Sequence, residues 1–249
     1  MKILVCINNV PDTTTKIKFV DNKGFDSSGV QWIINPWDEL ALTRTIEIKE
    51  AQPGAVETIT VINVGLAESE ATIRKALAIG ADNGVRINYN AQDSFSVAFQ
   101  LAEYIKKENY DIILCGTESS DYNGANVGGM LSEIIGLPSV SSVSYLDIID
   151  GKVILKREID GGQESISVHT PFVGIVQKGI AIEPKIPSMR GIMTARTKQL
   201  QVLGASACEI FTEFIEYELP KPKAACKKID SENVRELVQL LHNEAKVIY

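Results

Sequence analysis

The 249-residue sequence has little of what metal sites and disulfide-bonded folds require. It contains two histidines and four widely separated cysteines, with no Cys-x-x-Cys pair. Zinc sites and disulfide frameworks both depend on such residues at close or regular spacing. We therefore expect no bound metal, no disulfide framework and a reducing, cytoplasmic location.

Long apolar runs are also missing. A helix that crosses a bilayer needs about 20 consecutive apolar residues, and no run in this chain approaches that length. The first apolar run, Met1–Ile7, ends at the polar pair Asn8 and Asn9 and has no cleavage site of a signal peptide. We expect neither export nor direct membrane insertion.

Sequence motifs for covalent and zinc catalysis are absent as well. The chain has no Gly-x-Ser-x-Gly, no His-Glu-x-x-His and no Cys/His pairing. Its 25 basic and 32 acidic residues give a net charge of −7, which argues against nucleic acid as a partner. A hydrolase and a nucleic-acid-binding protein are both disfavoured.

What the first 140 residues do contain is an alternation of two periodicities. Apolar runs typical of strands alternate with helical stretches, in which apolar residues recur at helical spacing. The predicted strands are 3–7, 57–64, 84–88 and 111–116, and the clearest helices are 68–79 and 95–107. This order predicts an α/β fold with a parallel sheet that is buried on both faces by helices.

A third predicted helix starts at Asn35. Asn35 is a good N-cap, Pro36 suits the first helical position, and Asp38 can lie near the free backbone N–H groups of the first turn.

The pattern changes after Ser139. The runs 142–149, 153–159 and 165–168 alternate apolar and polar residues, and Asp150-Gly151 is a turn signal. We predict an antiparallel hairpin attached to the parallel sheet.

The C-terminal segment is predicted to be an extended arm followed by a helix. Pro220–Lys223 disfavours helix, whereas Ser231 can cap an amphipathic helix whose apolar residues are Val234, Leu237, Val238 and Leu241. That helix must dock either on its own domain or on another chain.

The loop Gly116–Val127 follows the fourth predicted strand and leads into a predicted helix, 127–135. Ligands of open α/β sheets bind at the carboxyl ends of strands, and glycines and a helix N-terminus suit a phosphate. The alternative is an ordinary flexible loop, because the spacing matches neither G-x-G-x-x-G nor the Walker pattern. We favour phosphate binding.

Two further segments each admit two interpretations. For residues 156–164 we favour a hairpin turn at Asp160–Gly162 between exposed strands over a site in which Arg157 or Glu158 faces another charged group. Residues 183–198 have no helical or strand period and are predicted to be a loop, in which methionines either fill the core or suit an adaptable partner surface. The loop also carries basic residues in an acidic chain, which suggests an anion or an acidic partner: Lys185, Arg190, Arg196 and Lys198.

These segments, in this order, resemble the β subunit of electron transfer flavoproteins nearly from end to end. Asn35–Glu39 is similar to the family's Asn-Pro-x-x-Glu element, and Ile73–Asp82 to its helix ending in Ala-x-Gly-Ala-Asp. Arg157–Glu164 followed by Pro171, and Glu183-Pro184 running into Ile192-Met193, are the most specific matches.

The resemblance implies a Rossmann-like domain over residues 1–204, with a partner-recognition loop at 183–198. Residues 205–249 would form an arm and helix that dock on an α subunit. The α subunit mainly holds the redox FAD, and this subunit holds a structural AMP. The AMP contacts carried over by position are Cys6, Asn35, Pro36, Trp37, Asp38, Val64, Gly116, Ser119, Ser120, Asp121, Tyr122, Asn123, Gly124, Ala125, Asn126 and Val127.

The resemblance also implies a function. Arg157 and Glu158 would lie near the flavin, and Met189 would anchor the carrier to its partners within a surface that includes Arg190, Ile192 and Met193. The heterodimer would carry electrons from acyl-CoA-type dehydrogenases to a quinone oxidoreductase, without catalysed bond chemistry in this subunit.

The departures from the family pattern define the alternatives. Met189 replaces a leucine, a volume-conserving change, and Arg190 replaces a proline. Asn123–Asn126 replaces the Asp-Thr-x-Gln of members that bifurcate electrons with FAD in this subunit, which favours AMP. An ATP-using α/β enzyme would need Ser-Gly-Gly-x-Asp-Ser where this chain has Ile7–Asp12. A self-dimerising nucleotide-binding module would not explain Arg157–Glu164.

Overall fold

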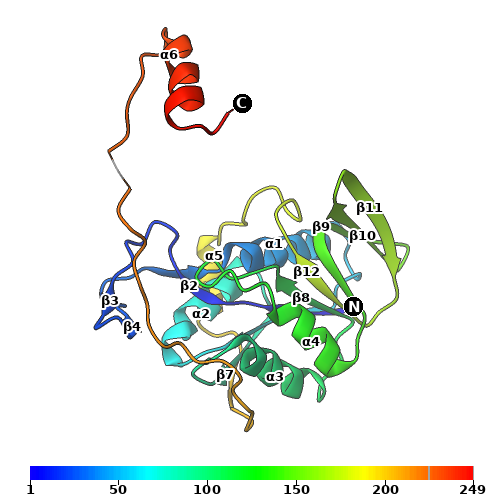
Figure 1. Ribbon diagram of the computed structural model, residues 1–249. Helices are drawn as coiled ribbons and strands as arrows, with labels where there is room; N and C mark the ends of the chain where they lie inside the picture. The colour runs from blue at the N-terminus through cyan, green and yellow to red at the C-terminus, as the bar shows by residue number, and fades with distance from the viewer. Residues whose placement is uncertain (224, 249) are drawn as a thin grey trace.

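A computed structural model describes residues 1–223 and 225–248. Ala224 and Tyr249, which belong to the predicted arm at 205–249, lie outside the described residues. The described chain forms an α/β domain, from which the C-terminal segment projects (Figure 1).

The centre of the domain is a nine-stranded sheet within the described residues. Its order is β11 (Gly162–Val168), β10 (Lys152–Ile159), β9 (Ser139–Ile149), β12 (Phe172–Val176), β8 (Ile112–Gly116), β1 (Lys2–Cys6), β6 (Thr58–Val64), β7 (Asn83–Asn88) and β13 (Leu200–Gly204). All neighbours from β9 to β13 pair in parallel, whereas β10 pairs antiparallel with β9 and β11. The predicted parallel sheet with an antiparallel hairpin is confirmed.

Helices cover both faces of this sheet. α1 (Pro36–Ala51) and α2 (Glu70–Ile79) bury one face, and α3 (Ser94–Ile105) and α4 (Val127–Ile135) bury the other (Figure 1). Because strand side chains alternate between faces, Ile3 and Val5 of β1 join the first core and Leu4 and Cys6 the second.

Smaller elements surround this frame. Two short sheets pair β2 (Asn9–Pro11) with β5 (Trp32–Ile34), and β3 (Phe19–Val20) with β4 (Gly24–Phe25). A single 3₁₀ turn, Ala67–Ser69, precedes α2, and α5 (Met189–Ala195) packs beside α2.

The order of the strands creates a switch point at β1. The chain leaves β1 toward β6 and β7 on one side, then returns through α3 to β8 on the other side. The loops after β1 and β8 therefore run in opposite directions from neighbouring strand ends. This is the place where open α/β sheets bind ligands.

Most predicted elements lie within two or three residues of their predicted bounds. The predicted turn at Asp150-Gly151 is also present, with φ of 50° and 76°. Such positive values match the hairpin turn that the residue pair predicted.

Two predictions about local structure are wrong. Residues 183–198 contain α5, whose N-cap Ser188 accepts a hydrogen bond from Gly191 N at 3.0 Å. The C-terminal helix, α6 (Val234–Gln239), is capped by Asn233 and not by Ser231. A π-helical turn, Leu240–Glu244, continues it.

The C-terminal helix does not dock on its own domain. α6 has no buried residue, and Figure 1 shows it well separated from the sheet at the end of an extended arm. Val234, Leu237 and Val238 are each at least 42% exposed. Of the two docking sites that the sequence left open, this arrangement disfavours the chain's own domain.

Candidate functional site

The carboxylate of Asp38 ties the two loops of the switch point together. Asp38 lies in the first turn of α1 and is buried. One of its oxygens accepts a hydrogen bond from Asn8 N after β1 (2.8 Å), and the other accepts one from Gly116 N at the end of β8 (2.9 Å). A single side chain thus sets the distance between the loops.

Burial raises the pKa of Asp38 to about 7, because the charged form loses its hydration. Hydrogen bonds from Asn8 N, the Asn35 side chain and Gly116 N oppose this rise by stabilising the carboxylate. The group can therefore change charge near neutral pH.

Asn35 holds the predicted nucleotide loop, Gly116–Val127, in a similar way. Its side-chain nitrogen donates to Glu118 O (2.8 Å), and its side-chain oxygen accepts from Ser120 N (3.1 Å). Asn35 is the N-cap residue of α1 as predicted, but its side chain forms no cap hydrogen bond there. The side chains of Asn35 and Asp38 bond the backbone of distant loops instead, which local sequence reasoning does not reveal.

Gly116 allows the closest approach in this region. A Cβ at this position would collide with the Asp38 carboxylate and would lie 2.8 Å from Cβ of Trp37. The first turn of α1 and the end of β8 can be this close only because residue 116 has no side chain.

The rest of the nucleotide loop leads to free backbone donors. Asn123 and Ala125 have positive φ (51° and 53°), and the side chain of Asn126 forms no cap on α4. The first hydrogen bond of the α4 backbone runs from Met130 N to Asn126 O. The N–H groups of residues 127–129 therefore have no partner within the helix and are available to an anion.

The predicted nucleotide contacts gather at this one edge of the sheet. They come from the ends of β1, β6 and β8, the start of α1 and the loop before α4. Cys6, Asn35, Asp38 and Val64 are buried. Pro36, Trp37, Gly116, Ser119, Ser120 and Val127 are half-buried, whereas Asp121, Tyr122, Asn123, Gly124, Ala125 and Asn126 are exposed.

Asn63 and Arg86 belong to the same end of the sheet but were not predicted. The Asn63 side-chain nitrogen donates to Ile7 O (2.9 Å), while its oxygen is buried without a partner among the described residues. Arg86 lies opposite Asn63 on β7, and its Nε is also buried and unpartnered there. A polar residue near the end of an apolar strand is the signal that could have identified both.

The first part of the C-terminal arm contacts the predicted nucleotide loop at Tyr122. The Tyr122 ring lies 5.2 Å from the ring of Phe214, which stacks on Tyr217 at 5.5 Å; Tyr217 stacks in turn on Phe19 at 5.0 Å. Burial, and then a hydrogen bond with Tyr217, raise the pKa of Tyr122. No pattern in the sequence indicated this contact.

Arg157 and Glu158 lie on a second surface, the hairpin β10–β11 at one end of the sheet order. Arg157 pairs with Glu164 on the neighbouring strand (Nε–Oε2, 2.7 Å). Glu158 accepts hydrogen bonds from Ser144 Oγ (2.7 Å) and Gln163 Nε2 (2.6 Å), which lower its pKa. This exposed carboxylate is therefore held in its charged form.

Met189, Arg190, Ile192 and Met193 form a third surface, on α5. Met189 is 77% exposed and Met193 is 70% exposed. These methionines do not fill core gaps, so one of the two interpretations from the sequence is excluded by burial.

The described chain was also compared with what a membrane span and a metal site require. None of its helices is long and apolar enough to cross a membrane. Within residues 1–223 and 225–248, no three His, Cys, Asp or Glu side chains are grouped so that they could hold a metal ion.

Comparison with known proteins finds relatives over most of the chain. The family model described as "Electron transfer flavoprotein domain" matches residues 23–207, which is more than half of the chain. A protein of Syntrophomonas wolfei named "Electron transfer flavoprotein subunit beta" is 38% identical over 99% of this chain and 98% of its own length.

The chain belongs to the electron transfer flavoprotein β-subunit family. Two further members with the same printed name extend the match. The Bacillus subtilis protein is 34% identical over the full length of both chains, and the Bos taurus protein is 30% identical over 82% of each. The predicted resemblance is confirmed.

Proposed function

We propose that this electron transfer flavoprotein β-family chain pairs with an α subunit as a heterodimeric electron carrier. The α subunit mainly holds the redox FAD, and this chain holds a structural AMP at the switch point. The heterodimer accepts electrons from acyl-CoA-type dehydrogenases and passes them to a quinone oxidoreductase. This subunit itself makes and breaks no covalent bonds.

The bridge formed by Asp38 is the observation that best supports the nucleotide site. The two Asp38 oxygens accept hydrogen bonds from Asn8 N and Gly116 N, and so hold the loops after β1 and β8 together. The free N–H groups at the start of α4 suit a phosphate, and the loop that leads to them carries the hydroxyl groups of Ser119 and Ser120. Cys6 and Val64, which are buried at the ends of β1 and β6, would offer an apolar wall to the base.

The β10–β11 hairpin supports a role toward the flavin. Arg157 and Glu158 are held in place by bonds to neighbouring strands, and their surface is free in this chain to meet another subunit. In the heterodimer they would place fixed charges beside the redox group, which when bound supplies all of the electron chemistry.

The exposed methionines of α5 support partner recognition. Electron-transfer encounters use small interfaces, and a flexible thioether adapts to different partner surfaces. We assign Met189 as the apolar anchor, with Arg190, Ile192 and Met193 around it.

Changing Met189 to Asp tests this function directly. In the heterodimer, a charge at the anchor must be desolvated on docking, so we expect Met189→Asp to slow reduction by an acyl-CoA dehydrogenase at least about tenfold. The rate is measured from flavin bleaching with acyl-CoA and dehydrogenase present. FAD content should not change.

Ile149→Asp is the matched control, because Ile149 is half exposed on the turn-side end of β9, away from α5. It should leave the rate of flavin reduction unaltered. Equal rates for wild type and Met189→Asp would contradict the assignment of the anchor. Loss of FAD from Met189→Asp would mean that α5 is structural.

A further inference from the structure

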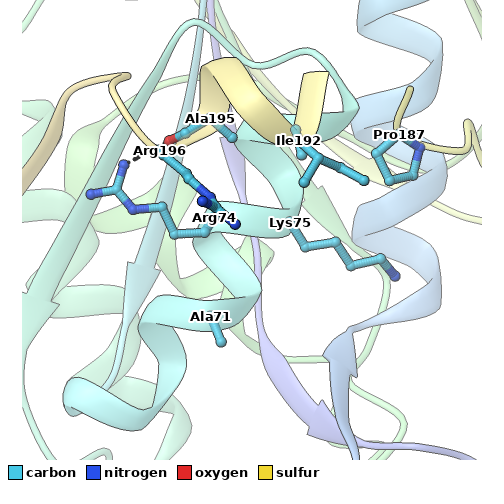
Figure 2. A pocket seen from close by; sticks show the side chains of 8 residues that line it. Ala71, Arg74, Lys75, Pro187, Ile192, Ala195 and Arg196 are labelled. Carbon is cyan, nitrogen blue, oxygen red and sulfur yellow. Dashed lines mark hydrogen bonds between the residues drawn. The ribbon is translucent and has the colours of Figure 1, made fainter. Parts of the chain in front are cut away.

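A cavity of about 520 Å³ lies between α2 and α5, next to the exposed methionines. Ala71 and Ala78 of α2 and Ile192 and Ala195 of α5 line it. Figure 2 shows Ile192 across from Ala71, with Pro187 to one side. These side chains are small or apolar. The cavity can therefore accept an apolar side chain with little loss of hydrogen bonding.

The walls of this cavity are held rigidly. Arg74 of α2 donates from Nη1 to Ala195 O and to Lys198 O, each at 2.9 Å, and Figure 2 shows its reach to Ala195. Lys198 Nζ donates to Leu77 O (2.9 Å) and Ala81 O (2.6 Å) at the end of α2. Both ties join α2 to the C-terminal end of α5 and the residues that follow it.

Gly191 completes the contact by its lack of a side chain. A Cβ at this position would collide with the carbonyl oxygen of Ala78. α5 therefore approaches α2 closely at this point, and the backbones that flank the open cavity are already in place. A preformed cavity loses less entropy on binding than one that must be assembled.

The charged side chains that line the cavity are basic, and they differ in whether an acidic side chain pairs with them. Arg74 lies 3.7 Å from Glu70, and Lys75 pairs with Glu39 at 2.8 Å. Arg196 lines the cavity, is exposed, and has no ion pair among the described residues. In a chain of net charge −7, this is a local site for a carboxylate.

We propose that the α2–α5 cavity is a socket for the dehydrogenase partner, occupied by an apolar side chain that a carboxylate flanks. The carboxylate pairs with Arg196 while the apolar side chain enters between Ala71 and Ile192. The inference rests on the proposed function, because the same helix carries Met189 and Met193. Each protein then contributes an apolar anchor. Met189 of this chain contacts the partner, and an apolar side chain of the partner enters the α2–α5 cavity.

Ala71→Phe tests the socket without disturbing the core. Ala71 is exposed on α2, so a phenyl group there fills the cavity but displaces no buried side chain. In the heterodimer with its α subunit, we expect the KM of the acyl-CoA dehydrogenase reaction for the carrier to rise about tenfold. FAD content and α-subunit binding should stay at the wild-type level.

Ala51→Phe is the control, because it adds the same group to an exposed position at the end of α1, outside the cavity. Arg196→Glu should also raise KM, and the effect should shrink at high salt because charge pairing at the surface is screened. Arg196→Gln should give a smaller rise than Arg196→Glu.

The outcomes separate this proposal from the one on which it rests. If Met189→Asp slows reduction while Ala71→Phe leaves KM unchanged, the socket is wrong and the anchor stands. If neither variant has an effect, both fail. If Ala71→Phe prevents assembly with the α subunit, the cavity belongs to that interface and the assignment to the dehydrogenase is overturned.

Discussion

At the residue scale, the proposed nucleotide site at the switch point depends on polar side chains that form hydrogen bonds with backbone groups far away in the sequence. Asp38 reaches backbone groups 30 residues before it and 78 residues after it. Asn35 reaches Glu118 and Ser120. From the sequence, both residues could be placed at a helix start, but their partners could not be predicted, because hydrogen bonds between segments so far apart in the chain leave no local pattern.

The raised pKa of Asp38 predicts a pH-dependent stability. Between the ordinary value of 3.8 and about 7, the folded chain keeps a proton that the unfolded chain has lost. The free energy of unfolding should therefore fall as pH rises through this window, by about 1.4 kcal/mol per pH unit and about 4 kcal/mol in total.

Urea unfolding of the chain between pH 4 and pH 8 measures this slope. Asp38→Asn should remove the contribution, whatever its effect on absolute stability, because an amide side chain does not titrate. Identical slopes in wild type and variant would show that Asp38 is charged throughout and that its hydrogen bonds outweigh burial.

At the scale of single elements, strong periodicity made most of the sheet predictable. β1, β6, β7 and β8 are apolar runs bounded by polar residues, and each lies within two residues of its predicted range. α5 was missed because it has only seven residues and its contact with α2 requires a glycine, which weakens any helical signal. Ser188 is a residue type that favours an N-cap, but the prolines and the glycine around it are typical of a loop.

The first part of the C-terminal arm, at Phe211 and Phe214, contacts the α/β domain. Phe211 N donates to Asp93, which also caps α3, and Phe214 lies against Tyr122 of the nucleotide loop. An aromatic pair of this kind is worth about 1 kcal/mol. Phe214→Ala should therefore release bound AMP roughly fivefold faster, as measured by dilution of the complex into excess unlabelled nucleotide.

Ile215→Ala is the control for the arm, since Ile215 is 86% exposed beside Phe214. It should leave the release rate unchanged. If Phe214→Ala releases AMP at the wild-type rate, the aromatic contact does not restrain the loop.

At the scale of the whole molecule, the order of the strands could not be predicted. β12 lies between β8 and β9, although it follows β11 in the chain, and β13 joins the opposite edge beside β7. Parallel pairs form between distant segments, so their order depends on packing of the whole chain. The predicted parallel sheet did indicate that a ligand site lies at a carboxyl edge, and this was enough to find the loop at Gly116–Val127.

The projecting C-terminal helix carries a prediction for assembly. Because α6 has no buried residue, removing residues 231–249 should leave the unfolding free energy of the isolated chain within about 0.5 kcal/mol of wild type. The same deletion should lower the amount of α subunit that copurifies with the chain. Full recovery of the α subunit would mean that the arm's end does not dock there.

Counting the ligands of the complex tests the proposed nucleotide site and function together. The chain is co-expressed with its α subunit, the heterodimer is purified, and FAD and AMP are extracted and quantified. We expect one FAD and one AMP per heterodimer. Two FAD and no AMP would contradict this expectation, because the switch point at β1 would then hold a second flavin and the protein would be a bifurcating carrier.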